Sequence, residues 1–298
     1  MKSPMGIGVS LVGRGISYVK AQPWLFRARR HLAHGALEKA RTCCIKASGA
    51  CSELGAAQTL LARILMPGGD YREVLSYLHD RLRPATYVEI GVRTAGSLAL
   101  AGACTAAIGI DPMFRIERPI RARARLYPLT SDEFFDHYDL LEELHAPRLA
   151  MAFVDGLHHF EQVLRDFINL ERYADRETLM LFHDCLPVSR IAATRPPRTT
   201  MRCGDVWKII PCLRKYRPDL TVRILPTIPS GLGIVIGGDR NSSVLGQRLE
   251  QIVAEHRDME LDYEYLTPEL LEQMPGILPN DPQHIDEAIL RPQQGGPR

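Results

Sequence analysis

The chain has 298 residues, of which 45% are hydrophobic and 24% are charged, and its formal net charge is +2. These values are typical of a soluble globular protein and argue against obligate binding to nucleic acid. No apolar run reaches the roughly 18 to 20 residues that span a bilayer. The seven cysteines include no CxxC pair, so the sequence has no zinc spacing. We expect a cytoplasmic protein with neither nucleic-acid nor membrane partners.

The two ends of the chain differ in charge. Residues 1–50 hold nine Lys or Arg and a single acid, Glu38, whereas residues 250–298 hold eleven acids and three arginines. The basic start could meet an anionic partner, but two solvated ends of opposite sign are the simpler interpretation. Because residues 1–37 contain no acid, an organellar presequence stays an alternative to the cytoplasmic assignment.

The first 85 residues show helical patterns. Pro23 is placed to open a first helix, and a second is expected over residues 52–66. A third follows Asp70 and Glu73, whose spacing is that of a capping box, and Pro84 would end it. We assign residues 1–67 to a helical N-terminal extension.

From residue 86 onward, short apolar runs alternate with helix-like stretches. The runs "TYVEIGV", "AAIGID", "LAMAFVDG" and "TLMLFHD" suit strands that are buried on both faces. Their alternation with helices predicts βαβ units, and "LTVRILPTIPSGLGIVIGG" predicts an antiparallel hairpin at a sheet edge. We therefore expect an α/β fold with a doubly wound, Rossmann-like, mostly parallel sheet over residues 68–240. Residues 241–298 are expected to form an acidic, helical C-terminal segment and tail.

The stretch "YVEIGVRTAGS" places Gly91 at the end of a strand and Gly96 before the next expected helix. Glycine at such a turn lets a ligand approach unpaired backbone N–H groups closely. The spacing lacks the GK[ST] of a P-loop and the GxGxxG of dinucleotide-binding turns, which disfavours a diphosphate. Asp111 ends the second strand, where a carboxylate could accept hydrogen bonds from a ribose diol. The combination predicts a nucleoside-type ligand; a plain turn with a capping Asp is the alternative.

Acidic and imidazole side chains follow the third and fourth strands. Asp155 and His158 lie in "FVDGLHHFEQVLRDF", and His183 and Asp184 lie in "LMLFHDCLP". Neighbouring strand ends of a doubly wound sheet open onto one crevice, so these four side chains should converge. Two carboxylates beside an imidazole can hold a divalent cation or transfer a proton.

These motifs, together with "IGIDP" and "GDVWK" followed by "GLGIVIG", resemble the class I S-adenosylmethionine-dependent methyltransferases. More narrowly, they resemble the branch that includes macrocin-type sugar O-methyltransferases and cephalosporin-hydroxylase-like proteins. The likeness covers about residues 68–238 and lies in the order and spacing of the motifs. It implies an enzyme that transfers a methyl group from S-adenosylmethionine to a hydroxyl of a small molecule or sugar.

The resemblance also implies roles for individual residues. Asp111 would hold the ribose hydroxyls, Ser131 would border the adenine, and His158 would be the catalytic base. Asp155, which would also border the cofactor, and Asp184 match the positions at which metal-dependent relatives bind magnesium. The methionine side of the cofactor would be lined by Glu89, Gly91, Gly96 and Ser97.

His183 departs from the family pattern, because metal-using relatives usually carry an acid before the residue that matches Asp184. An imidazole favours softer divalent ions than Mg²⁺. Mg²⁺ or another divalent cation, held by Asp155, Asp184 and His183, is therefore a secondary expectation. The primary expectation is that His158 removes the proton of the acceptor hydroxyl as the methyl group is transferred in line.

Two other functions stay open at this point. An NAD(P)-dependent oxidoreductase would share the sheet, although its GxGxxG turn is missing. A non-catalytic nucleoside-binding or assembly module would keep the crevice without the chemistry. The sequence does not identify the acceptor, for which a sugar or another natural product fits equally, and it leaves homo-oligomerisation open.

Two arginine-rich stretches have two interpretations. Five arginines lie between residues 115 and 125, and "SRIAATRPPRTTMR" follows Asp184 as a loop expected beside the crevice. Arginine forks suit an anionic substrate, but solvated surface explains the same residues. Trp207 is expected to pack a crossover helix rather than to line the rim of the crevice.

Overall fold

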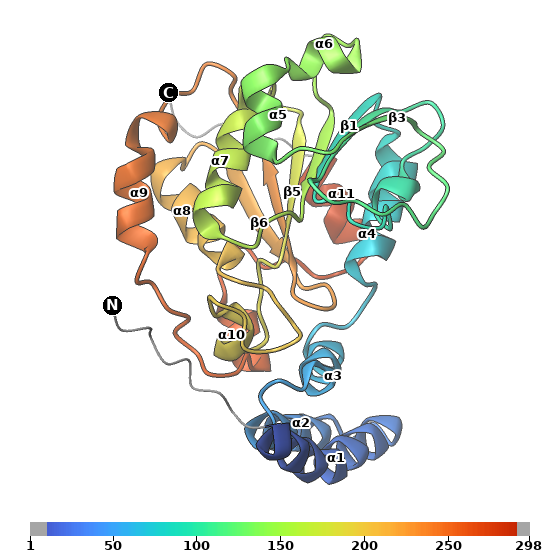
Figure 1. Ribbon diagram of the computed structural model, residues 1–298, viewed down its shortest axis with the longest axis vertical. Coiled ribbons are helices and arrows are strands. Elements are labelled where there is room, and N and C mark those ends of the chain that lie inside the picture. Colours follow the sequence, from blue (N-terminus) through green and yellow to red (C-terminus); the bar gives the residue numbers. More distant parts are fainter. Residues whose placement is uncertain (1–10, 291–298) are drawn as a thin grey trace.

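The computed structural model describes residues 11–290, and its centre is one seven-stranded sheet (Figure 1). The strands lie in the order β3-β2-β1-β4-β5-β7-β6, and β7 alone runs antiparallel to its neighbours. The strands are β1 (Thr86–Ile90), β2 (Ala106–Ile110), β3 (Arg123–Tyr127), β4 (Met151–Val154), β5 (Leu179–His183), β6 (Thr221–Leu225) and β7 (Leu232–Ile236). This arrangement confirms the predicted Rossmann-like sheet with an antiparallel pair at one edge.

Helices cover both faces of the sheet, which is why its central strands are apolar throughout. Every residue of β1, β4 and β5 is buried. One face packs against α5 (Ser131–His137), α6 (Leu140–Leu144), α7 (Phe160–Glu171) and α8 (Ile209–Tyr216). The other face packs against α4 (Tyr71–Leu82). Burial of alternate side chains in two opposite cores holds the strand ends in place.

Helix α4 begins as its sequence predicts. The Asp70 carboxylate accepts hydrogen bonds from the backbone N–H groups of Arg72 and Glu73, and the Glu73 carboxylate accepts one from the N–H of Asp70. The helix ends at Arg83, directly before Pro84. The capping box and the terminating proline are both confirmed.

Two local predictions are wrong. Pro23 does not open a helix but lies inside α1 (Leu11–Ala33), on an exposed side where water can bond the carbonyl left without a partner. The segment after Gly96 forms only the short 3₁₀ turn η1 (Leu98–Leu100) instead of the expected helix. That turn therefore offers no helix N-terminus to a ligand.

Strand β3 was also not expected, because it lies within the arginine-rich stretch. Its five residues form the sheet edge next to β2 and none is fully buried. Arg125, on this strand, pairs with Glu143 at 2.7 Å. An edge strand with one solvated face carries little of the apolar signal by which central strands are recognised.

The remaining helices lie at the N-terminal end and in the C-terminal part of the chain, and of these α11 (Pro282–Leu290) packs on the same face of the sheet as α4. α1, α2 (Leu37–Ala50) and α3 (Gly55–Leu65) pack on one another at the end of the molecule that is lowest in Figure 1. The C-terminal part contains α9 (Leu249–His256), α10 (Pro268–Gln273) and α11, and short 3₁₀ turns occur at η2 (Arg190–Ala193), η3 (Val206–Lys208) and η4 (Gly246–Arg248). Within residues 11–290, none of the helices combines the length and apolarity that crossing a membrane requires.

The C-terminal segment packs back onto the sheet domain. The backbone N–H of Leu278 donates to the carbonyl of Ile224 in β6, and Asp286 of α11 pairs with Arg81 of α4 at 3.0 Å. A division of the chain at residues 67 and 240 stays a prediction, since the outer segments share contacts with the central one.

Candidate cofactor and acceptor site

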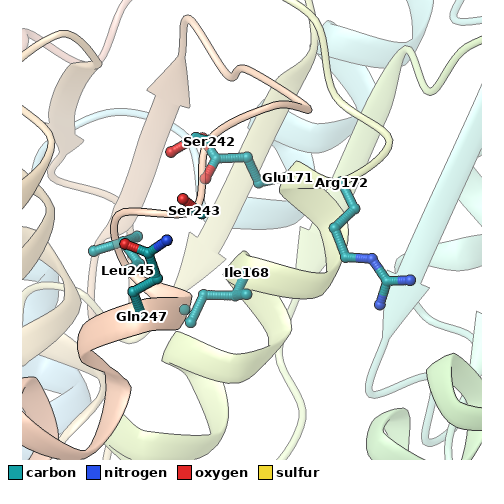
Figure 2. A pocket seen from close by; sticks show the side chains of 8 residues that line it. Ile168, Glu171, Arg172, Ser242, Ser243, Leu245 and Gln247 are labelled. Carbon is teal, nitrogen blue, oxygen red and sulfur yellow. The ribbon is translucent and has the colours of Figure 1, made fainter.

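A cavity of about 1390 Å³ opens where β1, β2, β4 and β5 end. Ligand crevices of doubly wound sheets lie at this edge. The sequence-predicted site residues that line the cavity are Gly91, Asp111, Ser131, Asp155, His158, His183 and Asp184. Glu89, Gly96 and Ser97 do not line it. A second cavity of about 360 Å³ lies between α7 and the segment before α9 (Figure 2), and no predicted site residue lines it.

Gly91 allows the turns after β1 and β4 to lie in contact. Its φ is +96°, and a Cβ atom there would lie 2.1 Å from the Asp155 carbonyl oxygen. Any other residue would have to displace the backbone that carries Asp155, since L-residues rarely adopt this conformation. Gly91 thus allows the backbone that carries Asp155 to take its position after β4. Gly91 also lines the cavity.

Glu89 lies beneath that turn, fully buried. The Tyr87 hydroxyl and the Ser97 hydroxyl each donate a hydrogen bond of 2.7 Å to its carboxyl group. Burial raises the pKa of Glu89 to about 8 despite these bonds. Glu89 and Ser97 were expected at the methionine side of the cofactor. Here they form a hydrogen bond with each other and support the turn after β1.

The Asp111 carboxylate faces the cavity and also holds the backbone of two neighbouring turns. One carboxylate oxygen accepts from the N–H of Arg93 and the other from the N–H of Met113, both at 2.7 Å. Each carboxylate oxygen has a second lone pair, so two hydroxyl donors could still be accepted. The predicted ribose-binding role is compatible with this geometry.

Two site residues near Ser131 were missed by the sequence reasoning. The Ser131 hydroxyl donates to Asp166 at 2.6 Å, and the Gln162 side-chain amide donates to the same carboxylate oxygen at 3.1 Å. Asp166 is fully buried, and burial raises its pKa to about 6. Gln162 and Ser131 line the cavity. The sequence does contain a signal for these two residues: Gln162 and Asp166 are polar and lie four positions apart, beside the apolar stripe of α7.

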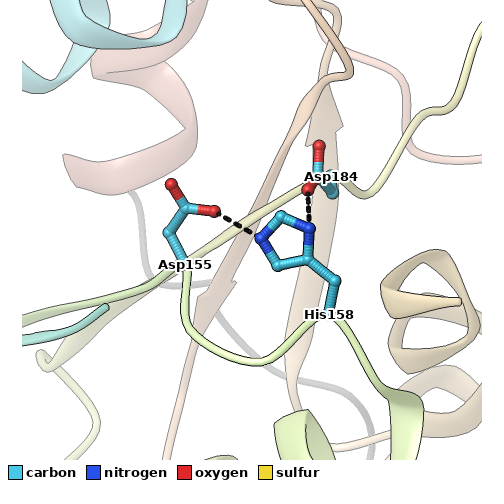
Figure 3. A group of neighbouring side chains, drawn as sticks. All are labelled: Asp155, His158 and Asp184. Atoms are coloured by element: carbon cyan, nitrogen blue, oxygen red, sulfur yellow. Dashed lines mark ion pairs between the residues drawn. The ribbon is translucent and has the colours of Figure 1, made fainter. Parts of the chain in front are cut away.

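The densest group of titratable side chains follows β4 and β5 (Figure 3). His158 lies between two carboxylates: its Nε2 is 3.3 Å from Asp155, and its Nδ1 is 3.0 Å from Asp184. Nδ1 also contacts the Arg202 carbonyl, which can only accept, so this nitrogen carries a proton. Nε2 is then the atom that can gain or lose one.

The charged side chains of this group shift one another's pKa values. Burial alone would lower the pKa of His158, but the hydrogen bond to Asp155 and the charge of Asp184 raise that pKa to about 9. Burial likewise opposes ionisation of Asp155, yet the neighbouring His183 and His158 hold its pKa below the usual range. In this state the cluster is an imidazolium between two carboxylates.

Asp184 and His183 are held firmly at the end of β5. Asp184 has a φ of +61° and accepts a hydrogen bond from the Ser230 hydroxyl. His183 Nδ1 lies 3.1 Å from Asp155, and its ring centroid lies 4.2 Å from that of Tyr71. Its Nε2 is buried, with no hydrogen-bond partner among the described residues. A left-handed aspartate at a strand end is a strained backbone of the kind found at functional sites.

The cluster fits a divalent cation by the chemistry of its donors. One ligand atom each from Asp155, His158 and Asp184 lie within 4.8 Å of one another. Two carboxylate oxygens and one imidazole nitrogen suit Mn²⁺, Fe²⁺ or Zn²⁺ better than Mg²⁺, which prefers oxygen alone. This group contains His158 instead of the predicted His183, although His183 Nδ1 also lies 3.1 Å from Asp155 and 3.5 Å from Asp184. The ligand role of His183 stays a prediction.

The wall opposite the strand ends is formed by the loop after Asp184 and by α3. The Thr200 hydroxyl accepts a 3.1 Å hydrogen bond from the Gly55 N–H, and Gly55, Ala56 and Thr59 line the cavity. Arg195 borders it too, but it pairs with Glu161 at 2.7 Å. The loop does lie beside the crevice, as expected. Nothing in the sequence predicted that a helix of the N-terminal extension would line the cavity.

The expectation for the "GDVWK" motif is confirmed. Trp207 packs against the core and does not line the cavity. Lys208 is buried, and its ammonium donates to the Arg257 carbonyl at 3.0 Å. These two residues support the fold around α8 and leave the crevice to the strand-end cluster.

A family model matches the part of the chain that contains the strand-end cluster. Residues 52–185, which contain every residue of the strand-end cluster, match the family model described as a methyltransferase domain. No curated protein matches the chain by sequence.

Solved structures show distant likenesses. An O-methyltransferase from Bacillus cereus in complex with SAH has a TM-score of 0.43 and 10% identity over 73% of this chain and 99% of that one. The Streptomyces achromogenes O-methyltransferase TomG, in complex with SAM, has a TM-score of 0.40 and 11% identity over 56% and 78%. The SAH-bound Podospora anserina methyltransferase PaMTH1 has a TM-score of 0.40 and 11% identity over 63% and 84%.

Over residues 52–185, which are less than half of the chain, the protein is therefore similar to methyltransferase domains.

Proposed function

We propose that the protein methylates a hydroxyl oxygen of a small-molecule acceptor and that His158 is the catalytic base. The observation that carries this proposal is the convergence of Asp155, His158 and Asp184 at one side of a cavity whose other side presents Asp111 and Ser131. The nucleoside end and the proton-accepting end of the site thus face one space. A sugar or another natural product is the proposed acceptor class, and the macrocin-type branch remains the narrower hypothesis.

The cofactor would lie along the ends of β1, β2 and β4. Asp111 would accept hydrogen bonds from the ribose hydroxyls, and Ser131 with Gln162 would border the adenine. The sulfonium end would then lie near Gly91, beside the cluster of Asp155 and His158. Glu89, Gly96 and Ser97 would act on that end through the backbone they support.

The reaction requires that a neutral hydroxyl lose a proton. The acceptor oxygen forms a bond to the methyl carbon as the carbon–sulfur bond breaks, and its proton moves to His158 Nε2. In the free protein this nitrogen is protonated below pH 9. The positive sulfonium of the bound cofactor would lower the pKa of His158 and thereby favour its neutral, accepting form.

A bound cation would change the role of His158. Asp155, His158 and Asp184 would hold the ion, and the ion would lower the pKa of a hydroxyl bound to it. His158 would then be a ligand and could not also accept the proton. Activity with and without EDTA separates the two modes: full activity in EDTA supports the base, and loss restored by Mn²⁺ or Mg²⁺ supports the ion.

The decisive variant is His158→Ala, with His159→Ala as its matched control. Both histidines line the cavity, but only His158 contacts the two carboxylates. Transfer of label from S-adenosylmethionine to hydroxyl compounds of a cell extract should fall by about 10² to 10⁴ for His158→Ala. Affinity for S-adenosylhomocysteine, measured by calorimetry, should stay near normal. Undiminished label transfer would remove His158 from the mechanism.

The cofactor assignment has a separate test. Asp111→Ala should weaken binding of S-adenosylhomocysteine by about 10- to 100-fold, since hydrogen bonds to a charged group contribute about 1.5 to 3 kcal/mol. Asp239→Ala, another exposed-loop aspartate that caps a turn but lies away from the cavity, is the control. Unchanged affinity of Asp111→Ala would refute the ribose assignment.

A further inference from the structure

The outer side of α1 exposes apolar side chains in a regular row. Ile16, Val19, Pro23 and Phe26 follow one another at spacings of three and four residues, which places them on one side of the helix. Val19 and Phe26 are 67% and 69% exposed. The opposite side, with Ala21, Leu25 and Ala28, is buried. The exposed row is therefore additional to the side by which α1 packs into the protein.

Basic side chains flank this row. Lys20, Arg27 and Arg30 lie on the same outward side of α1 and are exposed. None of the three forms an ion pair with a carboxylate among the described residues, and residues 1–37 contain no acid at all. We define the outer face of α1 as these three residues together with Ile16, Val19, Pro23 and Phe26. It is an apolar strip with uncompensated positive charge.

We propose that the outer face of α1 docks on an anionic lipid surface. A helix that lies in the membrane interface combines exposed apolar side chains, which enter the acyl boundary, with Lys and Arg, which contact anionic headgroups. Both components are present on one side of one helix. The proposed contact is peripheral, and it differs from the sequence-based expectation of no membrane partner.

The charge of this face argues against the two other occupants. A second copy placed symmetrically on it would bring the same arginines and lysine against each other, and like charges repel. Nucleic acid would satisfy the charge but would leave Val19 and Phe26 without an apolar environment, since its backbone contacts are electrostatic. An anionic bilayer satisfies both kinds of side chain.

The position of α1 permits such a contact. Figure 1 shows α1 at the extreme end of the molecule, beyond α2 and α3 and away from the sheet. The face is therefore not covered by the described part of the chain. The proposal is independent of the reaction, because no residue of this face lines the cavity.

The test is co-sedimentation of the full chain with vesicles. Phosphatidylcholine vesicles that contain phosphatidylglycerol are compared with vesicles of phosphatidylcholine alone. The expected result is binding to the anionic vesicles that weakens with added salt. Lys20→Glu/Arg27→Glu should reduce the partition coefficient by at least about 25-fold, since each basic residue near such a surface contributes about fivefold. Val19→Ser/Phe26→Ser should reduce it by at least about tenfold.

Matched controls lie elsewhere on the surface. Arg240→Glu and Val244→Ser make the same kinds of change at exposed positions of the loop after β7 and should leave vesicle binding unchanged. Melting temperatures check that the variants fold, and Lys20→Gln/Arg27→Gln provides a milder pair if charge reversal destabilises the helix.

Several results would overturn the proposal. They are equal binding to neutral and anionic vesicles, vesicle binding that the α1 variants do not weaken, binding to duplex DNA without vesicle binding, and a dimer by light scattering without vesicle binding. A loss of methyl transfer in the proposed active-site variants leaves this test unaffected, because vesicle binding is measured without substrate.

Discussion

Two acids, the buried Glu89 and the half-buried Asp155, belong to adjacent strands of the sheet and have opposite electrostatic environments. Glu89 on β1 is hydrogen-bonded by neutral donors, the hydroxyls of Tyr87 and Ser97 and the backbone of Leu98, and burial raises its pKa to about 8. Asp155, after β4, faces two imidazoles that lower its pKa. Burial disfavours the charge of both, so the neighbours decide the outcome. Under the proposed function, the residue on β1 would support the turn, whereas the residues after β4 and β5 would supply the charge for the reaction.

The sharpest test of this contrast compares two isosteric amides. Asp155→Asn removes the charge that faces His158 and should reduce turnover by about 100- to 1000-fold. Glu89→Gln resembles the protonated acid that burial favours, and should reduce turnover by less than about tenfold. Label transfer is measured for both, with S-adenosylhomocysteine affinity as the check on the site's integrity. Equal losses in the two variants would contradict the division of roles.

The two regions also touch, and Gly91 is the point of contact. Gly91→Ala would place a Cβ 2.1 Å from the Asp155 carbonyl oxygen at a φ of +96°, so we expect a destabilisation of at least about 2 kcal/mol. Gly49→Ala, inside α2 with no atom within 4 Å of the new Cβ, should instead be neutral or stabilise by up to about 1 kcal/mol. Denaturant unfolding measures both. A Gly91→Ala protein as stable as the wild type would show that the turns can separate.

pH affects activity and stability in opposite directions. Only neutral His158 accepts a proton, so turnover at saturating cofactor should rise with pH, by up to about tenfold per unit. It should level off below about pH 9, because the sulfonium of the cofactor would lower the pKa of His158 from the value of about 9 in the free protein. The raised pKa values of His158 and Glu89 both favour the protonated folded state. Their contribution is complete below the unfolded pKa of each group, and it is lost as pH rises toward about 9 for His158 and about 8 for Glu89.

The measurement is a pair of profiles from pH 6 to 9. The melting temperature should fall over this range while the rate rises, and Glu89→Gln should reduce the fall without changing the shape of the rate profile. A rate that is independent of pH would argue against His158 as the base.

The sequence predicts the parts of this molecule that depend on local pattern. Strands buried on both faces are continuous apolar runs, and the Asp70–Glu73 capping box is a local spacing, so both are predictable. Strand β3 lies at an edge of the sheet, and its residues Arg123 and Arg125 obscure the apolar pattern by which a strand is recognised in the sequence. The missing helix after Gly96 and the interior position of Pro23 depend on tertiary packing that no short window contains.

The candidate site divides in the same way. Asp111, Asp155, His158 and Asp184 are predictable because each follows a strand, and parallel strands end at one edge. Their pairing is not predictable, since side-chain rotation decides which nitrogen of His158 or His183 lies near which carboxylate. Glu89 was assigned to the cofactor from its place in a motif, although its contacts are internal.

The hydrogen bond from Gly55 to Thr200 affects how the enzyme can be shortened. A fragment cut at residue 68 would look complete by sequence motifs, yet it would lose Gly55, Ala56 and Thr59, which line the cavity opposite the strand-end cluster. The loop that carries the Arg202 carbonyl would lose an anchor, and with it the acceptor that keeps a proton on His158 Nδ1. We therefore expect that a fragment needs α3 to keep this cavity intact.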